Sequence, residues 1–336
     1  MNFLYKFLFV FLFCIEAVYA QTKQSETSAP KPLFDDPVYH GAADPVIIYN
    51  KQTKRWWMFY TNRRASLNDS SGVAWVHGTR IGIAESTDGK TWKYKDTANI
   101  NYRPDSGYTF WAPEIVEDKG LYHMYLTYVP GIFTDWNHPR DIIHLTSKDL
   151  VNWKYESLLP LALHKVIDAC VYRISDTSWR MWYNNEKDGK SIFYAESNDL
   201  YHWVDKGRAI PARGEGPKVF RWQEKYFMIV DVWKGMDVYS SDDLLNWKKQ
   251  PNRILEEPGA GKDDQAIGGH CDVVVKDNRA FVYYFTHPGR RKDMPAAKNS
   301  FDDKRSVIQV TELHYSNGIV TCSKDEPVCV NWNTNK

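Results

Sequence analysis

The heptapeptide Ser147-Lys-Asp149-Leu-Val-Asn-Trp153 decides the fold, because its pattern S-x-D-x-x-x-W occurs four times along the chain. The other three copies lie at residues 86–92, 197–203 and 241–247, so that successive copies start 44 to 61 residues apart. Ser and Asp side chains bond to the local backbone in turns. The Trp is expected to open the next strand and to pack between neighbouring units. Such a spaced recurrence indicates a repeated structural unit.

Three strand-like segments precede each copy of the turn, and the Trp opens a fourth. In the second unit the three segments are residues 115–117, 122–128 and 142–147, which contain many aromatic and β-branched residues. The sequence has no sustained helical periodicity. Five units of four antiparallel strands predict an all-β fold, a five-bladed β-propeller. The alternative, a β-sandwich, does not account for the recurrence of a whole four-strand unit.

The fifth unit departs from the pattern, with Glu312-Leu-His-Tyr-Ser-Asn-Gly318 in place of the turn motif. Terminal units of repeat proteins are commonly atypical. Either the segment before Asp44 or the tail after Gly318 is expected to close the ring.

The N-terminus has the features of a secretory signal peptide, with Lys6 before a short apolar run and Val18-Tyr19-Ala20 as a cleavage site. The apolar run is too short to span a bilayer as a stable anchor, although a retained anchor is the alternative. The mature protein is therefore expected to be secreted or periplasmic, without membrane association. We expect a signal peptide over 1–20, a flexible linker over 21–35 and a single propeller domain over 36–336.

The composition excludes some partners and leaves others open. The formal net charge is +1 and there is no long basic run, so strong binding to nucleic acid or anionic membranes has no electrostatic support. The aromatic content of 15% fits either an all-β protein or a carbohydrate binder. Cys322 and Cys329 could close a small loop in an oxidising compartment, whereas Cys170 and Cys271 lie in apolar strand-like segments and are expected to be buried.

Every innermost strand is predicted to begin with a carboxylate. Since the inner strands of a propeller all begin at one mouth of the central channel, these acids should converge there. The loops after the second strands should rim the same mouth, and they contain amide, aromatic and cationic side chains. The inner-strand residues are Asp44, Glu114, Asp168, Glu215, His270 and Asp272. The expected sugar-contacting residues are Arg63, His77, Trp111, Glu114, Asn184, Trp233 and His287.

Converging carboxylates suit the hydrolysis of a glycosidic bond, which needs a protonated acid near the leaving oxygen and an ionised carboxylate opposite it. Mutual repulsion in a partly desolvated funnel raises some pKa values, so that one group stays protonated near neutrality. The structural alternative is that such acids cap backbone N–H groups or hold a cation in the channel. His270 could be a metal or water ligand at the axis, or a neutral hydrogen-bonding core residue.

These residues resemble the motifs of glycoside hydrolase family 43 over nearly the whole chain after the linker. Ala43-Asp44-Pro45, Ile167-Asp168 and Glu215-Gly216-Pro217 match the family's three acidic motifs in order, and Phe110–Pro113 matches a fourth, with Glu114 where Asp is usual. The resemblance implies that Asp44 is the general base, that Asp168 tunes and orients the acid, and that Glu215 is the general acid of an inverting reaction. The carboxyl groups of the acid and base should then lie about 6.5–9.5 Å apart. It also implies no required cofactor, with a calcium ion or water near His270 in the channel.

The substrate is less well defined, because insertions around residues 66–77 and 290–304 do not match a common pattern. The five-bladed hydrolases of family 117, which act on algal polysaccharide, share the architecture. A fructan-cleaving relative is disfavoured because its opening motif is missing. The sequence therefore predicts an exo-acting glycoside hydrolase that takes a plant or algal oligosaccharide or polysaccharide. The alternative is a non-catalytic, sugar-binding propeller at the cell surface.

Overall fold

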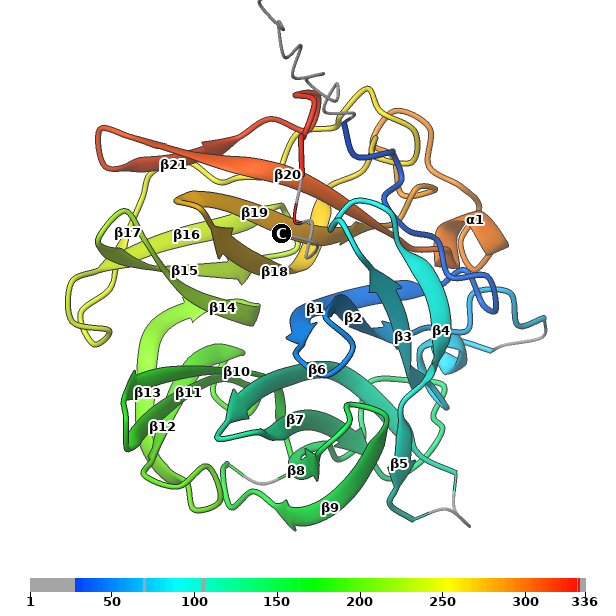
Figure 1. Cartoon of the computed structure of the whole chain (residues 1–336). Helices are drawn as coiled ribbons and strands as arrows, with labels where there is room; N and C mark the ends of the chain where they lie inside the picture. The colour runs from blue at the N-terminus through cyan, green and yellow to red at the C-terminus, as the bar shows by residue number, and fades with distance from the viewer. Residues whose placement is uncertain (1–27, 69–70, 104–106, 163, 331, 333–336) are drawn as a thin grey trace, which may run out of the picture.

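The computed structural model describes residues 28–68, 71–103, 107–162, 164–330 and 332, and it forms a five-bladed β-propeller (Figure 1). The predicted fold is confirmed: each blade is an antiparallel meander of four strands in chain order. Blade two gains an extra outer strand, β5, which pairs in parallel with β9. No helix among the described residues is long and apolar enough to cross a membrane.

The strand bounds follow the repeat. Blade one consists of β1 (Ala42–Asn50), β2 (Arg55–Asn62), β3 (Arg80–Ser86) and β4 (Lys93–Thr97). Blade two consists of β5 (Asn99–Asn101), β6 (Thr109–Asp118), β7 (Leu121–Val129), β8 (Asp141–Ser147) and β9 (Asn152–Leu158). Blade three consists of β10 (Val166–Ser175), β11 (Ser178–Asn185), β12 (Ser191–Ser197) and β13 (Val204–Arg213). Blade four consists of β14 (Glu215–Trp222), β15 (Lys225–Asp231), β16 (Met236–Ser241) and β17 (Lys248–Lys249). Blade five consists of β18 (Gly268–Lys276), β19 (Arg279–Thr286), β20 (Val307–Ser316) and β21 (Ile319–Cys322).

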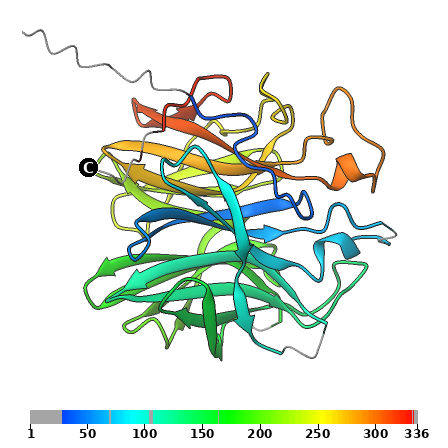
Figure 2. The same cartoon turned by 45° about the vertical axis from the view of Figure 1, so that its right-hand side comes forward.

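Two short helices lie in the long loops that follow the second strands of blades one and five. They are η1 (Ala74–Val76) and α1 (Phe301–Lys304). Figure 2 shows these two loops projecting at the same end of the molecule. A contact joins them there, since the guanidinium of Arg290 lies 5.8 Å from the ring centroid of Trp75.

The S-x-D-x-x-x-W turn has the same hydrogen bonds in all four copies. In the second copy, Ser147 Oγ donates to Asp149 Oδ1 at 3.0 Å and accepts the backbone N–H groups of Asp149 and Leu150. Asp149 Oδ1 in turn accepts the N–H groups of Val151 and Asn152, both at 2.8 Å. The two side chains therefore satisfy four backbone donors and fix the angle at which the Trp enters the next strand.

Each turn aromatic packs against the preceding blade, as predicted for the Trp residues. In blade five, Tyr315 occupies this role. The ring centroids lie 5.3–6.3 Å apart in the pairs Trp92–Tyr283, Trp153–Phe59, Trp203–Tyr125, Trp247–Trp182 and Tyr315–Phe227. A contact of this kind therefore joins every blade to the one before it around the ring.

Both chain ends contribute to ring closure. The tail after Gly318 supplies β21, the fourth strand of blade five, and Trp332 then packs on Trp56 of blade one with ring centroids 4.5 Å apart. The N–H groups of Leu33 and Phe34 donate to the carbonyl oxygen of Ile308 in β20.

The N-terminal boundary of the domain lies earlier than expected. The predicted signal peptide and residues 21–27 of the predicted linker lie outside the described residues. Leu33 and Phe34, at the end of that linker, are buried against blade five. The packed domain therefore includes residues placed in the linker. Cys322 forms no disulfide, so the loop that Cys322 and Cys329 could close is not formed, and Cys170 and Cys271 are buried as expected.

The five inner strands surround the propeller axis (Figure 1) and are joined there by one lysine. Lys218 Nζ lies 3.0 Å from Glu114 Oε2 and 2.8 Å from Asp272 Oδ1. Glu114 also accepts the N–H of Val171 at 3.0 Å, and Asp272 accepts the N–H of Ile47 at 2.6 Å. Strands β14, β6, β18, β10 and β1 are thus linked through one ammonium group. Burial alone would lower the pKa of Lys218, but the two carboxylates outweigh burial and raise it well above its ordinary value.

Replacement of Lys218 by methionine should destabilise the protein strongly, because it leaves two buried carboxylates without a cation. Removal of one partner of a buried ion pair costs about 3–5 kcal/mol, which urea unfolding at pH 7 can measure. Lys225→Met is the matched control, because Lys225 pairs with Asp242 on the surface, where an ion pair contributes little. Equal stability of the two variants would contradict the role given to Lys218.

Candidate active site

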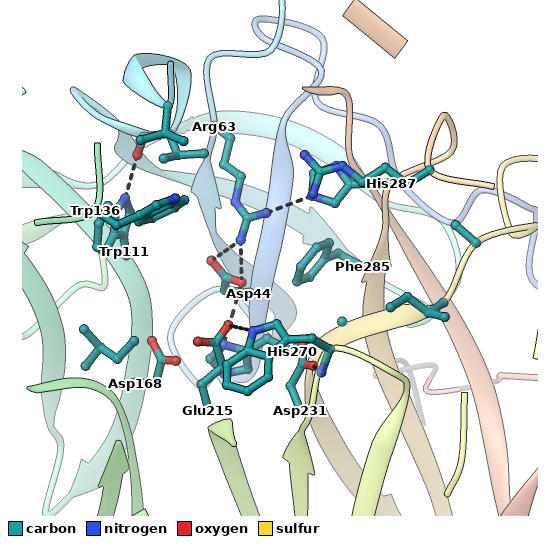
Figure 3. Close-up of a pocket in the computed structure, with 18 of the residues that line it drawn as sticks. Asp44, Arg63, Trp111, Trp136, Asp168, Glu215, Asp231, His270, Phe285 and His287 are labelled. Atoms are coloured by element: carbon teal, nitrogen blue, oxygen red, sulfur yellow. Dashed lines mark hydrogen bonds and ion pairs between the residues drawn. The ribbon is translucent and has the colours of Figure 1, made fainter. Parts of the chain in front are cut away.

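A pocket of about 1150 Å³ opens at the mouth where the inner strands begin. All five blades contribute to its lining, including the three acids predicted to be catalytic. Figure 3 shows Asp44, Asp168 and Glu215 around this space, on β1, β10 and β14 respectively. The structure therefore brings together side chains that are up to 171 residues apart in the sequence (215 − 44).

A β-bulge near the start of the inner strands directs these carboxylates into the pocket. The pairing register with the second strand shifts between Ala43 and Val46 in blade one, and equivalent shifts occur in the other four blades. Asp44 and Asp168 adopt φ values of +51° and +59°, and Gly216 has +55°. The left-handed region is costly for a residue with a Cβ. Bulges commonly re-aim side chains beside active sites.

Asp44 is held by a cation from the same blade. Arg63 Nη2 donates to both carboxylate oxygens of Asp44, at 3.1 and 3.3 Å, and His270 Nδ1 lies 3.7 Å from Oδ1. Arg63 is itself fixed by His287. His287 Nδ1 donates to the carbonyl oxygen of Arg305 at 2.9 Å, so its Nε2 accepts from Arg63 Nη1 at 3.1 Å. Burial, together with Arg290 and Arg63, keeps the pKa of His287 well below its ordinary value, consistent with this neutral form.

Asp168 is buried at the side of Glu215 (Figure 3). The backbone N–H of Gly216, next to Glu215, donates to Asp168 Oδ2 at 3.1 Å. Burial raises the pKa of Asp168 well above its ordinary value, and the negative charges of Glu215 and Asp44 raise it further. A direct bond therefore joins Asp168 to the start of the strand that carries Glu215.

Glu215 is the most accessible of the three acids, with 25% of its side chain exposed. Trp233 Nε1 donates to its Oε1 at 2.9 Å, and Lys190 Nζ lies 3.8 Å from its Oε2. Burial raises the pKa of Glu215, and the charge of Lys190 and the bond from Trp233 oppose this effect. A carboxyl with a raised pKa beside compensating donors can both give up and recover a proton, as a general acid must.

Asp231 is a fourth acid in the same pocket that the sequence prediction did not include among the catalytic residues. It is 4% exposed and accepts the backbone N–H groups of Trp233 and His270, each at 2.8 Å. Burial and the charge of Glu215 raise its pKa to about 7. Asp231 ends β15, as Asn62 ends β2, and this position in the repeat is the signal that could have identified it.

Four of the seven predicted sugar-contacting residues line the pocket: Arg63, Trp111, Trp233 and His287. Trp75, Trp136 and Arg290, from the loops expected to rim the mouth, also line the pocket. The lining contains further residues that the prediction did not select, among them Arg140, Lys190 and Arg213.

His77, Asn184 and Glu114, which were also expected to contact sugar, are not among the residues that line the pocket. His77 is buried behind Trp111 and its Nε2 lies 2.8 Å from His138 Nε2. Asn184 is buried and its amide donates to the backbone carbonyl of Gly214, just before Glu215. Glu114 lies past the bulge of β6 and pairs with Lys218 on the axis, below the pocket.

The residues at the axis do not fit the calcium ion implied by the family resemblance. Within the described ranges, no three His, Cys, Asp or Glu side chains are grouped to hold a metal ion. His270 lines the pocket beside Asp44, and the carboxylates of Glu114 and Asp272 are already paired with Lys218.

Comparisons with known proteins agree with this fold and give the family. The model of a glycoside hydrolase family 43-related family, described as "Probable glycosyl hydrolase domain", matches residues 33–262. The structure of a thermostable family-43 glycoside hydrolase superposes with a TM-score of 0.64 at 18% identity, over 88% of this chain and 97% of that one. A GH43_1 enzyme from Xanthomonas citri, complexed with xylotriose, gives a TM-score of 0.64 at 12% identity, over 90% of this chain and 96% of that one.

A curated relative in sequence is described as a probable sucrose-6-phosphate hydrolase, from Psychromonas ingrahamii. It is 26% identical over 155 residues, which are 38% of this chain and 28% of the relative. The chain therefore matches little more than a quarter of the length of that relative.

The raised pKa of Asp231 predicts a dependence of stability on pH. Its folded pKa of about 7 lies above that of an unfolded Asp, about 3.9. The stability it contributes is therefore full below pH ~4 and is lost as the pH rises through about 7, by a few kcal/mol. Asp231→Asn should reduce the loss of stability between pH 4 and pH 8, as measured by urea unfolding.

The readout is the pH dependence and not the absolute stability. Asn has one side-chain oxygen, so it can accept only one of the two backbone N–H groups that Asp231 accepts, and the variant loses stability at every pH. Asp176→Asn is the control, since that side chain is fully exposed. Parallel pH profiles for the wild type and Asp231→Asn would show that Asp231 is ionised throughout.

Proposed function

Since the chain belongs to the glycoside hydrolase family 43-related family, we propose that it is an exo-acting glycoside hydrolase that removes a terminal sugar with inversion of configuration. The observation that carries the proposal is the convergence of Asp44, Asp168 and Glu215 from three blades in one pocket. Their environments differ, which is what a division into acid and base requires.

Glu215 acts as the general acid in this proposal. Its raised pKa favours the protonated form before reaction. The proton passes to the glycosidic oxygen as the bond to the anomeric carbon breaks, and Lys190 and Trp233 then stabilise the carboxylate that remains. Asp168 bonds to the N–H of Gly216 and holds the start of β14 in place.

Asp44 acts as the general base. Arg63 donates to both of its oxygens and holds the carboxylate in place. One carboxylate oxygen takes a proton from a water molecule as that water attacks the anomeric carbon from the face opposite the leaving group. The whole reaction then uses side chains and water, without a cofactor.

The shape of the pocket supports cleavage at a chain end. Loops of all five blades line it, with Trp136 of blade two, Trp233 of blade four and Arg290 of blade five among them. A rim on every side admits the end of a polysaccharide more readily than its middle. The stacking faces and cations in the lining suit an oligosaccharide. The substrate class we propose is a plant or algal oligosaccharide or polysaccharide, and we expect the protein to be exported to meet it.

Glu215→Gln should lower kcat by about 10²–10⁴-fold on a substrate with a poor leaving group, because the proton donor is lost. The decrease in kcat on an aryl glycoside with a good leaving group should be much smaller, because such a group departs with little protonation. Asp44→Asn should be impaired on both substrates, because each needs an activated water. Rates on a panel of aryl and alkyl glycosides measure the effect.

Asp176→Asn is again the control and should retain full activity. Activity unchanged in both the Glu215 and the Asp44 variants would refute the assignment of roles. Tight sugar binding without hydrolysis of any member of the panel would favour the non-catalytic binding protein instead.

The stereochemistry of the first product distinguishes inversion from retention. Proton NMR during the first minutes of hydrolysis should show the anomer opposite to that of the substrate, because a single displacement by water inverts the centre. A product with the anomeric configuration of the substrate would contradict the role of Asp44 as a base and indicate a covalent intermediate.

A further inference from the structure

The hydrogen bond between Trp233 and Glu215 distinguishes the two oxygens of the proposed acid. Trp233 Nε1 lies 2.9 Å from Glu215 Oε1. An indole N–H is a donor only, so Oε1 accepts this bond whether Glu215 is protonated or ionised. The proton of the neutral acid is therefore favoured on Oε2.

Trp233 is held in place by several independent contacts. Its backbone N–H donates to Asp231 Oδ1 at 2.8 Å, and two cations lie over its ring, Lys190 Nζ at 5.3 Å and Arg213 Cζ at 5.0 Å from the centroid. Its φ of +59° is unfavourable for a large aromatic residue. Such a conformation persists only where the surroundings over-determine it, which is common at functional sites.

The other oxygen of Glu215 faces a cation. Lys190 Nζ is 3.8 Å from Glu215 Oε2 and 2.8 Å from Glu186 Oε1, and Glu186 also pairs with Arg140. The ammonium is thus anchored by a neighbouring carboxylate, close to the oxygen that would lose the proton.

We propose that Trp233 is a positioning residue that fixes the catalytic proton of Glu215 on Oε2, and that Lys190 stabilises the carboxylate after the proton has left. This inference rests on the proposed function. The Oε2–H bond breaks as its proton passes to the glycosidic oxygen, and the negative charge left on Glu215 is shared between the N–H of Trp233 and the ammonium of Lys190. Water, deprotonated by Asp44, supplies the hydroxyl group that replaces the leaving alcohol.

A simpler role for Trp233 is to stack its ring on a sugar, because the residue is 37% exposed and lines the pocket. A stacking role predicts a change in KM alone. A positioning role predicts changes in kcat, in the pH profile and in the sensitivity to the leaving group, because the proton donor itself is altered.

Trp233→Phe separates the two roles, since it keeps an aromatic ring and removes the N–H. The alkaline limb of the kcat profile should move about 0.5–1 pH unit higher, which is the effect of one lost hydrogen bond to a carboxylate. At neutral pH, kcat should fall about tenfold or more on a poor leaving group and much less on a good one. Lys190→Met should move the same limb in the same direction.

Trp136→Phe is the matched control, because Trp136 is an exposed Trp of the same pocket whose ring has no bond to a carboxylate among the described contacts. It should change KM but not the pH limb. If Trp233→Phe changes KM alone, as this control does, the positioning role is refuted.

A measurement without turnover tests the same bond. With ¹⁵N-labelled Trp, the indole signal that disappears in Trp233→Phe should shift with pH as Glu215 ionises, and the shift should vanish in Glu215→Gln. If the indole signal does not shift with pH and Glu215→Gln still abolishes activity, this inference is refuted but the proposed function is not. A signal that titrates, in a protein that Glu215→Gln leaves fully active, refutes the acid assignment and with it the inference.

Discussion

The contact of Lys218 with Glu114 and Asp272 is the interaction on which the rest of the ring depends. Each carboxylate also accepts a backbone N–H from a further inner strand, so a single ammonium connects all five blades at the axis. Carboxylates that meet in a desolvated channel need a cation, and here the chain supplies it. The ammonium thereby offsets part of the negative charge that lies below the pocket.

The pocket is made by the same irregularity in successive blades. A bulge near the start of each inner strand interrupts the alternation of side chains and sends carboxylates of β1 and β10 toward the mouth. The positive φ values of Asp44 and Asp168 cost about 1–3 kcal/mol each. The packing of five blades through their turn aromatics offsets that cost, so the strain is held where the chemistry is proposed to occur.

The repeat explains how much of this could be predicted from the sequence. The four turn motifs equate positions between blades, which gave the fold, the docking of the turn Trp residues and the placement of Asp44, Asp168 and Glu215. Loop paths have no such register, so Asn184 was expected in the pocket but instead bonds to Gly214. Lys218 has no local motif that marks it as the axial cation. The bond from Trp233 to Glu215 depends on a positive φ that the residue type does not suggest.

The most direct test of the central claim is a crystal structure of Glu215→Gln with an oligosaccharide bound. We expect a terminal sugar in the pocket, with the glycosidic oxygen beside residue 215 and a water molecule bonded to Asp44 on the opposite face. The carboxyl of Asp44 and the amide of residue 215 should lie about 6.5–9.5 Å apart. A separation near 5 Å, or a sugar bound away from these residues, would contradict it.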